Sequence, residues 1–130
     1  MIVVDASALA AALGDDGDDG DTARARMLGQ SLVAPELIDV EVASVFRRQL
    51  LSRQLDSRRA ELALADLVDL PMRRVAHRPL LARCWGLRLN LTIYDAAYVA
   101  LAELLDDVLL TADVRLSKAP GLRCQVDLIR

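Results

Sequence analysis

The stretch Met1-Ile2-Val3-Val4-Asp5-Ala6-Ser7-Ala8-Leu9-Ala10-Ala11-Ala12-Leu13 decides the fold. Residues 2–4 form a β-branched run without polar alternation, which is typical of a strand buried on both faces. The Ala- and Leu-rich segment 6–13 predicts a helix, and Asp5 is placed to cap its N-terminus. A carboxylate therefore lies at the carboxyl end of a predicted parallel strand, where open α/β sheets bind their ligands.

The length of 130 residues favours a single domain over residues 1–130. Hydrophobic residues make up 54% of the chain but aromatic residues only 3%, so Leu, Val, Ile and Ala must build the core. No apolar run reaches the roughly 18 residues that span a membrane, and no basic region of a signal peptide begins the chain. We therefore expect a cytoplasmic protein. Cys84 and Cys124 have no metal-ligand spacing, which predicts two reduced, mostly buried thiols.

The net charge of −3 argues against a protein that holds nucleic acid over its whole surface. Five acids lie within residues 15–21, however, whereas the 16 Lys and Arg residues are dispersed, so the total hides local basic patches. We expect residues 14–21 to form a solvated loop before a helix that begins at Asp21 or Thr22. A calcium loop is the alternative, but its twelfth position would be Arg26 or Met27 instead of Glu.

The remaining periodicities predict an alternation of strands and helices. Strands are expected at 31–34, 72–76, 108–111 and 125–129, the last at an edge, and helices at 36–53, 56–67, 78–89, 93–105 and 114–119. This order implies a three-layer α/β/α fold with a central parallel sheet of about five strands.

Several acids are set into these apolar segments: Asp5, Asp95, Asp113 and one acid of the helix 36–53. Because parallel strands point their carboxyl ends at one rim of the sheet, the acids are expected to converge there. Capping is the structural alternative for each, and Asp95 would then form a capping box with Thr92. On the helix 36–53, Asp39 and Glu41 lie at opposite edges of the apolar arc, and periodicity does not choose between them.

Other chemistries find little support. His77 is the only histidine and is expected to cap or pack the helix after it, which leaves no histidine-rich metal site and no Ser-His-Asp triad. A haloacid-dehalogenase-like phosphatase would need a second Asp where this chain has Ser7. A response-regulator receiver would need a Lys after a late strand, and the only Lys, Lys118, lies five residues past Asp113.

Four segments together resemble the PIN-domain ribonucleases, and more narrowly the VapC-type toxins of bacterial type II toxin–antitoxin pairs. They occur in the family's order: Ile-Val-Val-Asp-Ala-Ser at 2–7, Ala-Pro-Glu-Leu-Ile-Asp-Val-Glu-Val-Ala-Ser-Val-Phe-Arg-Arg at 34–48, Leu-Thr-Ile-Tyr-Asp-Ala-Ala-Tyr-Val-Ala-Leu-Ala at 91–102 and Leu-Leu-Thr-Ala-Asp-Val-Arg-Leu at 109–116. The resemblance covers essentially the whole chain. Family members often have Arg directly after the last Asp, whereas this chain has Val114 and then Arg115.

The resemblance assigns the family's catalytic and metal-binding acids to Asp5, Glu41, Asp95 and Asp113, and thereby selects Glu41 over Asp39. It also matches Ser7 and Thr111 to hydroxyl residues that would orient the metal ligands by hydrogen bonds. Two carboxylates about 4 Å apart repel by about 4 kcal/mol at an effective dielectric constant of 20, so a cation is expected among them. An all-oxygen set of this kind suits Mg²⁺ or Mn²⁺.

The resemblance implies a metal-dependent endoribonuclease that cleaves RNA phosphodiester bonds with a metal-activated water. It further implies a VapB-like antitoxin as partner, an RNA substrate and a homodimer. The alternative is a non-catalytic PIN-like module that binds a partner, and the intact set of acids argues against it.

Overall fold

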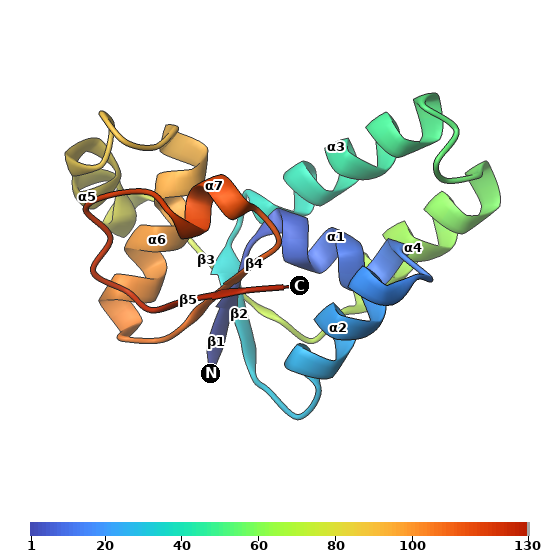
Figure 1. Ribbon diagram of the computed structural model, residues 1–130, viewed down its shortest axis with the longest axis horizontal. Helices are drawn as coiled ribbons and strands as arrows, with labels where there is room; N and C mark the ends of the chain where they lie inside the picture. The colour runs from blue at the N-terminus through green and yellow to red at the C-terminus, as the bar shows by residue number, and fades with distance from the viewer. Residues whose placement is uncertain (130) are drawn as a thin grey trace.

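The computed structural model describes residues 1–129 and has a five-stranded sheet at its centre (Figure 1). The strands are β1 (Ile2–Val4), β2 (Leu32–Pro35), β3 (Arg73–Val75), β4 (Leu109–Thr111) and β5 (Val126–Leu128). Their order is β3-β2-β1-β4-β5, and all neighbours are parallel. The helices are α1 (Ala6–Gly14), α2 (Asp18–Met27), α3 (Ile38–Leu51), α4 (Ser57–Asp69), the 3-10 helix η1 (Arg78–Leu80), α5 (Leu81–Gly86), α6 (Ile93–Leu105) and α7 (Val114–Ser117).

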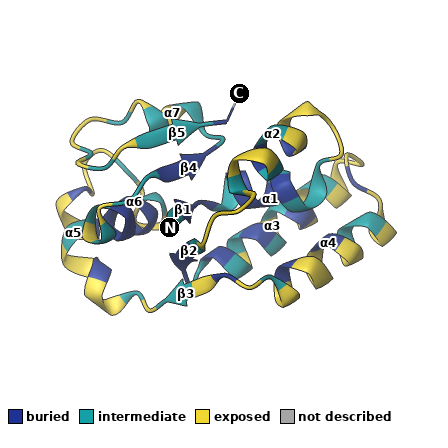
Figure 2. Cartoon of the chain, turned by 90° about the horizontal axis from the view of Figure 1, so that it is seen from below, coloured by how far each residue is buried: buried dark blue, intermediate teal, exposed yellow. Residues whose placement is uncertain are grey.

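Helices cover both faces of the sheet. The helices α1 to α4 lie on one side and α5 and α6 on the other, which confirms the expected α/β/α layers (Figures 1 and 2). Residues 96–102 of α6 are all buried, because this helix packs on β1, β2 and β4 while α5 packs on it in turn. The central strands are equally apolar, and Val3, Val4, Leu109 and Leu110 are buried.

The register of β1 and β4 places Asp5 and Thr111 side by side. Val4 pairs with Leu110, so Asp5 and Thr111 follow at the same level of the sheet. The Asp5 N–H donates to the Leu110 carbonyl at 3.1 Å, which extends the ladder by one residue beyond β1. The carboxyl ends of the central strands thus meet at one rim, as the parallel topology requires.

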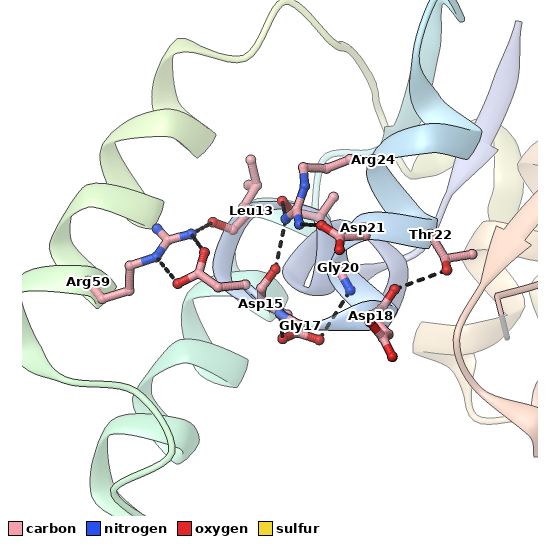
Figure 3. Close-up of polar contacts among 11 residues, drawn as sticks. Leu13, Asp15, Gly17, Asp18, Gly20, Asp21, Thr22, Arg24 and Arg59 are labelled. Carbon is pink, nitrogen blue, oxygen red and sulfur yellow. Dashed lines mark hydrogen bonds and ion pairs between the residues drawn. The ribbon is translucent and has the colours of Figure 1, made fainter.

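The acidic segment after α1 is a helix N-terminus and not the loop that we expected. The helix α2 begins at Asp18, three residues before the predicted start. The Asp15 carboxylate accepts the N–H groups of Gly17 at 2.8 Å and Gly20 at 3.2 Å (Figure 3). Acids in the first turn are favoured by the helix dipole, which explains why an aspartate-rich sequence is helical here.

Two arginines hold the C-terminal end of α1 (Figure 3). Arg24 of α2 donates to the carbonyls of Ala12 at 2.9 Å and Asp15 at 2.8 Å. Arg59 of α4 donates to the Leu13 carbonyl at 2.8 Å. Carbonyls in the last turn of a helix have no hydrogen-bond partner within the helix, and these arginines supply one. Both α2 and α4 are thereby hydrogen-bonded to the end of α1.

One further expectation needs correction. The predicted helix 78–89 is shorter and consists of η1 followed by α5, which ends at Gly86. The His77 side chain makes no capping bond to η1; its Nε2 accepts the N–H of Leu37 at 2.9 Å instead. Cys84 and Cys124 are both free, as expected, and Cys84 is buried. Within residues 1–129, no helix has the length and apolar character to span a membrane.

Candidate active site

Asp5 is a buried residue, with 5% of its surface exposed. One oxygen, Oδ1, accepts from the Ser7 hydroxyl at 2.6 Å and from the Ala8 N–H at 2.9 Å, so the residue also caps α1 as expected. The other oxygen accepts from the Thr111 hydroxyl. The pKa of Asp5 is raised to about 6, mainly by burial and to a smaller extent by the charge of Asp95, while these three hydrogen bonds lower it.

Ser7 and Thr111 connect the ends of β1 and β4. The Ser7 hydroxyl accepts the Ala112 N–H at 2.9 Å and lies 3.3 Å from the Thr111 hydroxyl. Thr111 in turn accepts the Asp113 N–H at 3.0 Å. Both hydroxyls donate to the Asp5 carboxylate and thereby fix its position.

Asp39 and Glu41, the two acids of α3 between which periodicity did not choose, have different partners in the structure. Asp39 forms a salt bridge with Arg74 of β3, with 3.0 Å between Oδ1 and Nη2. Glu41 instead faces α6 and accepts a 2.5 Å hydrogen bond from the Tyr98 hydroxyl. Burial raises the pKa of Glu41, as does Asp95, whereas the bond from Tyr98 and the charge of Arg48 lower it.

Tyr98 is the site residue that sequence reasoning missed. The residue is only 1% exposed, and its pKa is raised first by burial and then by the bond to Glu41 and the charges of the nearby acids. The sequence marks Tyr98 as an apolar neighbour of Asp95, three residues earlier on the same helix face. The signal that was available is its hydroxyl, because a buried tyrosine hydroxyl usually needs a hydrogen-bond partner.

Asp95 is the acid that links the other three electrostatically. Burial and the charge of Asp113 raise its pKa, and Asp95 in turn raises the pKa of Asp5 and of Glu41. The Thr92 hydroxyl accepts the Asp95 N–H at 3.1 Å, but the reciprocal bond of a capping box is not formed among residues 1–129. The Asp95 carboxylate is therefore not engaged with the Thr92 N–H.

Asp113 caps α7 and shares a small hollow with Asp95. Its Oδ1 accepts the N–H groups of Arg115 at 2.9 Å and Leu116 at 3.5 Å. The hollow has a volume of about 230 Å³, and its polar lining comprises Asn90, Thr92, Asp95, Asp113 and Arg115. Asp113 is thus both a helix cap and part of an open, charged surface.

The donor set suits a hard cation, although it is not a closed cage. Within the described residues, no group of three or more His, Cys, Asp or Glu side chains is arranged to hold a metal ion. Mg²⁺ is usually bound through one or two carboxylates and keeps several waters, so an open set of carboxylate oxygens fits its chemistry. The four predicted acids therefore form an electrostatically linked group, and not a preformed cluster of ligands.

Sequence comparison decides the family. A model of the PIN domain matches residues 2–122, which include all of these residues. The chain is 43% identical over 129 residues to Ribonuclease VapC1 of Mycobacterium tuberculosis, covering 98% of this chain and 97% of the relative. The chain belongs to the VapC family of PIN-domain proteins. A second VapC relative, VapC ribonuclease Mb0985 of Mycobacterium bovis, is 41% identical over 129 residues and covers 99% of this chain and 98% of its own.

Solved structures share the VapC fold at lower identity. The crystal structure of Mycobacterium tuberculosis VapC20, described as a Sarcin-Ricin loop cleaving toxin, matches with a TM-score of 0.69 and 19% identity, covering 94% of this chain and 96% of that one. PAE2754 from Pyrobaculum aerophilum matches with a TM-score of 0.69 and 24% identity, covering 98% and 83%. The sheet and its flanking helices are thus the PIN-like α/β/α fold.

Proposed function

We propose that this VapC-family chain is an Mg²⁺- or Mn²⁺-dependent endoribonuclease and the toxin of a VapBC-type toxin–antitoxin pair. The observation that carries the proposal is the group of acids at the carboxyl ends of the central strands, in which the charge of Asp95 acts on the buried Asp5 and on Glu41. Two relatives that match nearly the whole chain are named ribonucleases, which supports RNA as the substrate.

In this proposal Asp5 and Asp95 hold the cation most directly, and Glu41 and Asp113 act partly through water. An ion held by these residues would supply a water of lowered pKa as the nucleophile and would stabilise negative charge on the scissile phosphate. It also offsets the repulsion among the carboxylates, which otherwise opposes both folding and the approach of a polyanion. The surrounding protein groups then determine where each carboxylate points.

Hydrogen bonds orient three of the four proposed ligands, Asp5, Glu41 and Asp113, while leaving acceptor capacity for a cation. Asp5 accepts three bonds in all, whereas an ionised carboxylate offers roughly four lone-pair sites. Tyr98 engages only Oε1 of Glu41, and the α7 amides engage only Oδ1 of Asp113. Ser7, Thr111 and Tyr98 are therefore proposed to act as positioning residues.

The two acids of α3 provide a matched test. We expect Asp95→Asn and Glu41→Gln to abolish most Mg²⁺- or Mn²⁺-dependent RNA cleavage. Asp39→Asn, which removes one carboxylate from the same helix, is expected to retain it because Asp39 faces Arg74. Undiminished cleavage by Asp95→Asn would reject the site. No cleavage by the wild type and no binding of Mn²⁺ would favour the non-catalytic partner-binding module.

This chain has an exposed apolar surface on α3 and α4, to which we propose that the antitoxin binds. Val40 is 70% exposed, Val68 73% and Leu64 42%, and together they line a groove between the two helices. Exposed apolar surface of this kind is typical of protein interfaces. Co-expression with an adjacent small reading frame is expected to yield a complex, and Val68→Asp is expected to weaken it. Gel filtration with light scattering tests the proposed homodimer of the chain alone.

A further inference from the structure

Two exposed arginines stand on opposite sides of the acids. Along the sheet, α3 follows β2 and α7 follows β4, and these strands flank β1, the strand that ends at Asp5. Arg48 lies on α3 and Arg115 on α7, and both are exposed. Each lies near enough to a different acid for its charge to lower the pKa of that acid: Arg48 lowers that of Glu41, and Arg115 lowers that of Asp95.

Arg48 lies on the same face of α3 as Glu41. The separation of seven residues is close to two helical turns, or about 10 Å along the axis. Its Nη1 lies 3.4 Å from the hydroxyl of Ser44, which occupies the same face between them. Within residues 1–129 Arg48 forms no salt bridge, so its guanidinium has no carboxylate to give up when an anion binds.

Arg115 lies at the edge of the hollow that contains Asp95 and Asp113, and it is the only Lys or Arg among the residues lining it. Its side chain is 92% exposed, and its Nε lies 3.8 Å from Asp113 Oδ1. A long ion pair at an exposed position contributes little stability, so the guanidinium is available to another anion at little cost.

We propose that Arg48 and Arg115 bind the RNA phosphates on the two sides of the phosphate that is cut, so that the strand crosses the acids from α3 to α7. The inference rests on the proposed function and adds the path of the substrate. Acids alone repel a polyanion, and a bound cation serves one phosphate only, whereas an arginine on each side holds the adjacent backbone. These arginines contact substrate and are separate from the metal ligands.

The test replaces each arginine by glutamine and uses Arg58→Gln as the control, because Arg58 is an exposed arginine on α4. A fluorescein-labelled RNA of about 12 nucleotides, within the length that single-strand sites span, reports binding by anisotropy and cleavage by gel. We expect Arg48→Gln and Arg115→Gln each to raise KM about five- to tenfold, with kcat nearly unchanged. The slope of log affinity against log salt concentration is expected to fall by about 0.7 for each arginine removed.

The affinity for Mn²⁺, followed by its effect on the melting temperature, separates substrate binding from an effect on the acids. Replacing a positively charged arginine next to carboxylates cannot weaken the attraction of those carboxylates for Mn²⁺. The affinity for Mn²⁺ is therefore expected to stay the same or to increase. A salt slope equal to that of Arg58→Gln, or a loss of Mn²⁺ affinity, would overturn the inference while leaving the nuclease intact. RNA binding that depends on both arginines, in a wild type that does not cut, would overturn the nuclease and support the strand path.

Discussion

The buried Asp5 predicts a pH dependence of stability that a single substitution removes. In the metal-free protein its pKa is raised from 3.8 to about 6, mainly by burial. The folded state therefore holds this proton more tightly than the unfolded state, so Asp5 favours folding below about pH 4 and loses that contribution as the pH rises through about 6. The change amounts to about 3 kcal/mol of unfolding free energy, and Asp5→Asn lacks it because asparagine does not titrate.

Urea unfolding in EDTA from about pH 4 to about pH 7 measures this difference. The wild type is expected to lose about 2.4 kcal/mol of the full change relative to Asp5→Asn across that range, whatever constant offset separates the two proteins. Mg²⁺ added near neutral pH is expected to stabilise the wild type and leave Asp5→Asn nearly unchanged. Parallel stability curves for the two proteins in EDTA would refute the reasoning from burial.

Three other substitutions test contacts described above. Tyr98→Phe removes the hydrogen bond to Glu41 and is expected to lower Mn²⁺ affinity about 10- to 100-fold by calorimetry; an unchanged affinity would remove Tyr98 from the site. Gly20→Ala places a Cβ 1.8 Å from the Asp15 carbonyl oxygen, and we expect a loss of about 2 kcal/mol or more in urea unfolding. Gly86→Ala is its control, because its Cβ would meet only the flexible end of Arg83 at 3.6 Å, and stability equal to that of Gly20→Ala would contradict the clash. Arg74→Met breaks the salt bridge to Asp39 and the bonds to carbonyls at the end of α4, and a cost of about 1 to 3 kcal/mol is expected by thermal unfolding.

The sequence predicted best those features that depend on neighbours along the chain. The strand that ends at Asp5, the cap that Asp5 forms and the Thr92 cap of α6 all follow from local patterns, and each is present. The start of α2 was misplaced because Gly and Asp are poor helix formers by propensity, and the dipole and the Asp15 bonds override that preference here.

Contacts between distant segments were beyond the reach of periodicity. Asp39 and Glu41 differ only in what faces them, and the partners, Arg74 and Tyr98, come from β3 and α6. The family resemblance selected Glu41, whereas the structure supplies the physical distinction between the two acids. His77 likewise bonds to Leu37, a residue 40 positions earlier, which no local pattern indicates.

The two arginines at the end of α1 make three helices depend on one another. If α2 detaches, the carbonyls that Arg24 serves lose their donor, and if α4 detaches, Leu13 loses the donor from Arg59. Amide hydrogen exchange is therefore expected to report α1, α2 and α4 opening as one cooperative unit. The helix α1 begins directly after Asp5. Loosening the C-terminal turn of α1 is therefore expected to raise the mobility of the Asp5 carboxylate at its N-terminus.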